Sequence, residues 1–87
     1  MALRNKYVYD KLIKITIPYL GPSTYRFIDR QIINHLGIEP EKLRDTEIKD
    51  LIDWMRLSMS LLTENDQTVK EYIQEIELLA RGSDEKI

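Results

Sequence analysis

The chain has 87 residues, of which 43% are hydrophobic and 32% charged, with one histidine and no cysteine. This length allows a single domain, and the hydrophobic share excludes a wholly disordered chain. Without cysteine there is neither a disulfide scaffold nor a thiolate metal site. The apolar runs are too short to span a bilayer, and the first residues are amphipathic and charged, unlike a signal peptide, so we expect a cytoplasmic protein.

The net charge of −2 argues against a dedicated nucleic-acid binder, but the charges are unevenly distributed. Residues 1–38 carry six Lys or Arg and two Asp, a balance of +4, whereas residues 39–87 carry seven Lys or Arg and thirteen Asp or Glu, a balance of −6. This asymmetry is expected if the two halves face each other or if two copies pair head to tail. A solvated mixed surface without a partner gives the same pattern, since surface ion pairs contribute little to stability.

Two helices are predicted in the first half of the chain. Apolar residues at helical spacing indicate a helix over about residues 3–19, which should end near Thr16 because Pro18 disfavours helical geometry at the residue before it. A second helix should begin with Pro22 just inside its first turn and run to about Leu36. Gly37 then provides a left-handed C-cap.

A short 3₁₀ turn near Pro40 should lead to Leu43, which we expect in the core, and Asp45 or Thr46 should cap a third helix over residues 46–62. This helix carries two apolar stripes, which are Ile48, Leu51, Ile52, Met55, Met59 and Leu62, and Trp54, Leu57 and Leu61. A helix with so broad an apolar surface is covered on two sides, so it is either the centre of the bundle or also a dimer face. A fourth helix should follow a polar turn at residues 63–66 and span residues 67–81.

These elements predict an all-α fold, a compact four-helix bundle with a short extra turn near residues 40–44. We expect one helical domain over residues 1–82, with Gly82 ending the last helix and a disordered tail over residues 83–87. The predicted core consists of Leu12, Ile13, Tyr25, Ile28, Ile32, Leu43, Ile48, Leu51, Ile52, Met55, Met59, Ile73 and Ile76.

The sequence offers no reaction centre. His35 lies in the last turn of the second helix, where we expect it to cap carbonyls and complement the helix dipole. Its side chain has no identifiable nucleophile partner, and one histidine without cysteine supplies too few ligands for zinc. No nucleotide-binding or metal-binding motif is present. We therefore predict no enzymatic activity, no catalytic residue, no metal and no cofactor.

One segment carries a resemblance. Tyr19-Leu20-Gly21-Pro22 opens a helix, and Arg30, Leu36-Gly37-Ile38, the Glu-Pro-Glu-Lys-Leu segment and a long apolar helix follow in order. Over about residues 10–80 this order resembles a small all-helical, Leu-Gly-Pro-containing module at the ends of prokaryotic signalling proteins, including some Ser/Thr kinases and regulators. The resemblance implies a non-catalytic regulatory or scaffolding role.

We therefore expect a small protein-interaction or regulatory module that acts through an apolar helix face and associates with a protein partner or with a second copy of itself as a homodimer. The side chains expected to bind the partner are Trp54, Leu57, Leu61, Phe27 and Tyr19. The alternative is weak nucleic-acid binding through the basic N-terminal helix. Its cations would be Arg4, Lys6, Lys11, Lys14, Arg26 and Arg30.

Overall fold

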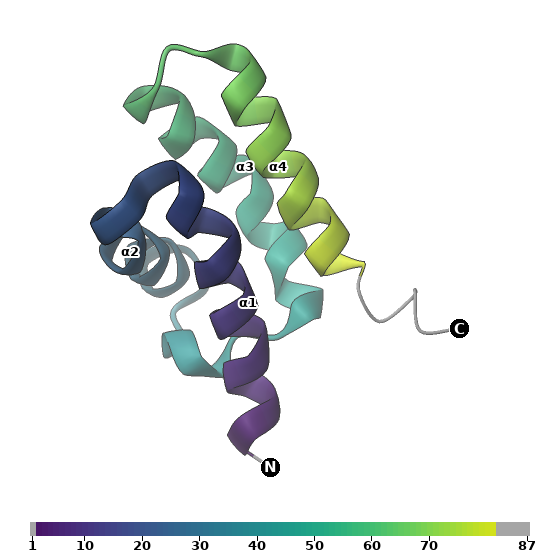
Figure 1. The fold of residues 1–87 in the computed structure, drawn as a ribbon. Helices are drawn as coiled ribbons and strands as arrows, with labels where there is room; N and C mark the ends of the chain where they lie inside the picture. Colours follow the sequence, from purple (N-terminus) through teal and green to yellow (C-terminus); the bar gives the residue numbers. More distant parts are fainter. Residues whose placement is uncertain (1, 82–87) are drawn as a thin grey trace.

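The structure is a computed structural model that describes the backbone of residues 2–81 and the side chains of residues 7–81. Within these residues it contains four α-helices and two 3₁₀ turns, and no strand (Figure 1). The elements in chain order are α1 (Ala2–Leu20), η1 (Gly21–Ser23), α2 (Thr24–Leu36), η2 (Pro40–Lys42), α3 (Asp45–Leu62) and α4 (Asp66–Ala80). The prediction of an all-α fold is confirmed, while the expected helix end at Gly82 and tail over residues 83–87 lie outside the described residues.

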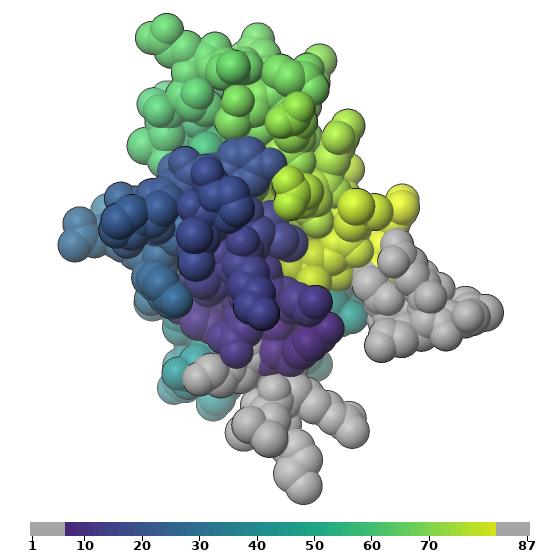
Figure 2. All heavy atoms as spheres, viewed as in Figure 1, coloured from purple at the N-terminus to yellow at the C-terminus, as the bar shows by residue number. Residues whose placement is uncertain are grey.

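Helices α3 and α4 form a helical hairpin, and α1 and α2 pack against it. Helices α3 and α4 run antiparallel to each other and form the most extensive helix–helix contact in the fold (Figure 1). Helix α1 packs against both α4 and α2, and the turn η2 lies against α1. The spheres of α1 and α4 meet at the surface in Figure 2, so residues from the two halves of the chain close the core together.

Helix α1 continues through Pro18 to Leu20, so the predicted end near Thr16 is wrong. A proline inside a helix has no N–H and so removes one backbone hydrogen bond. Here the missing hydrogen bond lies in the last turn of α1, and the Pro18 side chain is exposed. The same turn gains tertiary contacts. The ring of Tyr19 packs edge-on against the ring of Tyr72, with 5.0 Å between centroids, and Leu20 packs against the core.

The helix ends show which cap residues the chain uses. Gly37 adopts a left-handed conformation with φ of 68° and its N–H donates to the carbonyl of Ile33, which confirms the predicted C-cap. Helix α3 begins at Asp45 with Arg44 as the N-cap residue, so the predicted caps Asp45 and Thr46 are wrong. The reason is that the Glu47 carboxylate reaches back and accepts from the Arg44 backbone N–H at 3.0 Å.

The starts of α2 and α4 use different residues. Pro22 lies in the 3₁₀ turn η1 before α2, instead of just inside α2. For α4, the polar turn supplies Asn65, whose side-chain oxygen accepts from the N–H groups of Gln67 and Thr68 at 2.9 and 3.2 Å. These two bonds satisfy N–H groups that have no partner inside the helix.

Eleven of the thirteen predicted core residues are buried, two are not, and the core also contains Val8, Val69 and Tyr72, which were not predicted. Tyr25 is 55% exposed and Ile52 is only partly buried. Tyr25 lies outside because the buried stripe of α2 starts one residue earlier, at Thr24, and continues through Ile28 and Ile32. The buried hydrophobic side chains are Val8, Leu12, Ile13, Ile28, Ile32, Leu43, Ile48, Leu51, Met55, Met59, Val69, Tyr72, Ile73 and Ile76.

A buried polar pair joins α1 to α4. The Thr16 hydroxyl donates to the Leu12 carbonyl at 2.9 Å and lies 2.7 Å from the Tyr72 hydroxyl. A threonine hydroxyl has one hydrogen, and Leu12 receives it, so Tyr72 is the donor and Thr16 the acceptor of the second bond. Both side chains are fully buried, and this hydrogen bond therefore fixes the position of α4 against α1.

Candidate protein-interaction face

Helix α2 packs against α3, and in Figure 1 it is seen nearly end-on while α3 lies across the view. Near the end of α2, the imidazole of His35 stacks on the Trp54 indole with 4.1 Å between centroids and 10° between planes. One turn earlier in α2, the Gln31 side-chain amide donates to the Ser58 hydroxyl at 3.0 Å. The contact on α3 thus moves toward its C-terminus as the chain is followed back along α2.

The second apolar stripe of α3 lies on the surface of the chain. Trp54 is 47% exposed, Leu57 56% and Leu61 80%. Their spacing of three and then four residues places them on one side of the helix. The other stripe supplies Ile48, Leu51, Met55 and Met59 to the core. Among the described residues, the stripe with Trp54 is therefore not packed into the core, and His35 is the side chain that stacks on the Trp54 ring.

A groove of about 310 Å³ continues this stripe between the start of α2 and the end of α3. Its apolar lining comes from Leu20, Phe27, Leu61 and Leu62. We call the surface formed by Trp54, Leu57, Leu61, Leu62 and Phe27 the α2–α3 face. Leu62 was not predicted as part of this surface, because the helical period places it in the buried stripe, whereas it is 59% exposed at the end of α3.

Opposite charges lie at the two ends of the α2–α3 face. Arg26 and Arg30 line the groove beside Leu61 and Leu62. At the other end, Asp50 precedes Trp54 by one helical turn, and Asp53 accepts a hydrogen bond from Arg56 at 2.8 Å. Among the described residues, Arg26, Arg30 and Asp50 form no salt bridge.

Tyr19, the fifth side chain expected to bind a partner, belongs to a different surface. Its hydroxyl donates to the Glu75 carboxylate of α4 at 2.6 Å. Burial, followed by this hydrogen bond and the negative charge of Glu75, raises the pKa of Tyr19 to about 12. Tyr19 therefore joins α1 to α4 and is not brought together with Trp54, Leu57, Leu61 and Phe27.

The cations expected to bind nucleic acid are divided between two grooves. Lys11 and Lys14 line a groove of about 490 Å³ with the exposed rings of Tyr7 and Tyr25, and Lys11 Nζ lies 5.4 Å from the Tyr7 ring centroid. Arg26 and Arg30 line the groove of the α2–α3 face instead. The side chains of Arg4 and Lys6 lie outside the described ones. The expected single basic patch is thus not assembled from the four described cations.

Other polar side chains that the structure describes form contacts between helices. The Tyr9 hydroxyl donates to Asp29 at 2.7 Å, and burial together with this bond raises the pKa of Tyr9. The stacking of His35 on Trp54 places its ring on α3, a contact that the sequence did not reveal. Over residues 7–81, whose side chains are described, no group of three histidine or acidic side chains is placed to hold a metal ion.

Within the part of the chain that the structure describes, no helix combines the length and the apolar composition needed to cross a membrane. Comparison with models of protein families, with curated proteins and with solved structures found no match to this chain. The resemblance to helical modules of signalling proteins therefore stays a prediction, and the functional argument rests on the α2–α3 face.

Proposed function

We propose that this chain is a non-enzymatic protein-interaction module that binds a partner protein through the α2–α3 face. The observation that carries the proposal is the exposure of Trp54, Leu57 and Leu61 on one side of α3, next to an apolar groove. Contiguous exposed apolar surface of this kind marks binding sites in proteins. Tryptophan and arginine are also the residue types that dominate binding energy at interfaces; Trp54 belongs to the face, and Arg26 and Arg30 lie at one end of it.

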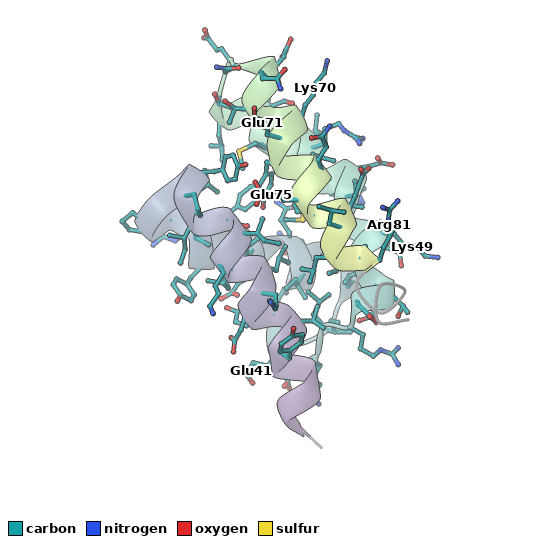
Figure 3. All side chains as sticks on the ribbon, turned by 45° about the vertical axis from the view of Figure 1, so that its right-hand side comes forward. Glu41, Lys49, Lys70, Glu71, Glu75 and Arg81 are labelled. Carbon is teal, nitrogen blue, oxygen red and sulfur yellow. The ribbon has the colours of Figure 1, made fainter. Side chains whose placement is uncertain are left out.

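The outer surface of α4 provides a contrast. Figure 3 shows Lys70, Glu71 and Glu75 along this helix, with Glu75 on the side of α1. All three side chains are exposed. Such charged residues are depleted at the centres of interfaces, so the α4 surface is suited to solvent and the α2–α3 face to a partner.

The resemblance to modules of prokaryotic signalling proteins extends the proposal to a regulatory role in the cytoplasm. In that role the module changes the location or the activity of the partner by binding it. The partner is another protein or a second copy of the chain.

Photo-cross-linking in cells tests the proposal. A photoreactive amino acid is introduced at Leu57, in the centre of the face, and in a matched control at Lys70 on α4. We expect a covalent adduct at Leu57 that is lost when Trp54→Ala and Leu61→Ala are added, and no adduct at Lys70. Both sites are exposed, so circular dichroism should show unchanged helicity. Absence of an adduct at Leu57, or equal adducts at both sites, would contradict the proposal.

A second candidate is weak binding of single-stranded nucleic acid in the groove of Tyr7, Lys11, Lys14 and Tyr25. Two exposed tyrosine rings beside two lysines favour it, because bases stack on aromatic rings while cations bind phosphate. Changing Lys11 and Lys14 together to glutamate should then abolish binding to an oligonucleotide. For the unchanged chain, these two phosphate contacts would give a salt slope of about −1.4. Binding that ignores this double change, or that persists unweakened at about 0.2 M salt, would exclude this candidate.

A further inference from the structure

We infer that a second copy of this chain occupies the α2–α3 face, with the two α3 helices antiparallel about a twofold axis near Leu57. In this arrangement Arg26 and Arg30 of one copy face Asp50 and Asp53 of the other. The inference rests on the proposed function and names the partner. It combines the apolar stripe with the opposite charges at its two ends.

The first step is the position of the arginines along α3. His35 contacts Trp54, and one turn earlier in α2 Gln31 contacts Ser58, one turn later in α3, so the contact moves toward the end of α3 as α2 is followed toward its start. Arg30 and Arg26 therefore lie close to the last turn of α3. Their position in the groove with Leu61 and Leu62 agrees with this.

The second step is the position of the acids. Asp50 lies seven residues before Leu57, which corresponds to about 10 Å along a helix. A twofold axis at Leu57 carries Asp50 to the same distance on the other side, at the end of the partner's α3. There it meets the level of Arg26. Asp53, four residues before Leu57, is carried in the same way to the level of Leu61, close to Arg30.

The third step is the choice of the twofold axis. A parallel pairing of the two α3 helices would place each acid against the same acid and each arginine against the same arginine. The antiparallel pairing places opposite charges together at both ends, and it covers Trp54, Leu57 and Leu61 with the same residues of the other copy. A partner that complements this face needs an apolar centre with an acid at one end and a base at the other. A second copy of the chain in antiparallel pairing has these features, so charge complementarity favours it.

A charge-exchange experiment tests the inference with exposed residues that are not in the core. One variant carries Asp50→Arg, and the other carries Arg26→Glu with Arg30→Glu. Light scattering over a concentration series should show the unchanged chain, of 10.4 kDa, at twice that mass. Each variant alone meets like charges at both ends of the interface and should dimerise at least about tenfold more weakly.

Mixing the two variants supplies the decisive result. In the mixed dimer the arginine introduced at position 50 of one chain meets the two glutamates introduced in the other. The Asp50 kept by the second chain meets the Arg26 and Arg30 kept by the first, so association should return to the level of the unchanged chain. Lys70→Glu, a charge reversal on α4, serves as the control and should leave the dimer intact. Circular dichroism of each chain verifies that it is folded.

Three outcomes would overturn the inference: a monomer at every concentration, variants that dimerise as well as the unchanged chain, or a mixture that does not associate. A monomer whose Leu57 still cross-links to a protein of another mass would remove the second copy as partner and keep the proposed function. A monomer without any adduct would remove both.

Discussion

Replacing Thr16 with valine should destabilise the fold more than replacing Tyr72 with phenylalanine, although both changes remove the same hydrogen bond. In the first change the Tyr72 hydroxyl, which is fully buried, loses its acceptor and keeps its desolvation penalty. We expect a cost of about 2 kcal/mol. In the second change Thr16 still donates to the Leu12 carbonyl, and the cost should be about 1 kcal/mol.

The chain with both changes should be close to the original, within about 0.5 kcal/mol, because no buried hydroxyl is left without a partner. Urea denaturation followed by circular dichroism gives the free energy of unfolding of all four chains. If the effects of the two changes add, or if Thr16→Val costs no more than Tyr72→Phe, the donor assignment and the coupling between α1 and α4 are wrong.

Three further predictions concern the stacking of His35 on Trp54, the C-cap at Gly37 and the hydroxyl of Tyr19. His35→Ala should make the fluorescence of Trp54, the only tryptophan, more sensitive to acrylamide, since the stacked imidazole shields one face of the indole; equal quenching in both chains would contradict the stacking. Gly37→Ala should lower the free energy of unfolding by about 1 kcal/mol, because φ is 68° while no atom lies near the added methyl group; a neutral result in urea denaturation would show that the cap relaxes. Because the pKa of Tyr19 is raised from 10.0 to about 12, the folded chain binds more protons than the unfolded chain in that interval. Stability should therefore be intact below pH 10 and fall as the pH rises toward 12, less so in Tyr19→Phe, as urea denaturation at each pH can measure.

Local signals in the sequence were sufficient for the fold class and several element ends. The helical period of apolar residues identified the helices, Gly37 identified the end of α2, and the Glu39-Pro40 pair identified η2 with Leu43 in the core. In each case the preference of one or a few adjacent residues and the tertiary structure point the same way.

Other features depended on contacts between distant residues and could not be predicted locally. The local preference of Pro18 predicts that α1 ends before it, but α1 continues to Leu20, and its last turn is held by the packing of Tyr19 on Tyr72. The sequence predicted the apolar stripe of Trp54, Leu57 and Leu61, but its exposure among the described residues follows only from where α2 and α4 pack. The sequence assigned Arg26 and Arg30 to a basic N-terminal patch, because their place beside Leu61 depends on how α2 packs against α3.

The bond between Thr16 and Tyr72 joins residues that are synthesised at different times. These residues are 56 positions apart, so at about 5–20 residues per second the ribosome needs about 3–11 s to add the second after the first. During that interval the buried side of α1 has no α4 to cover it, while the Thr16 hydroxyl already has its partner at Leu12 within the same helix. The contacts between α1 and α4 therefore cannot form until α4 has left the ribosome, and until then the apolar surface of α1 that α4 covers stays open to aggregation.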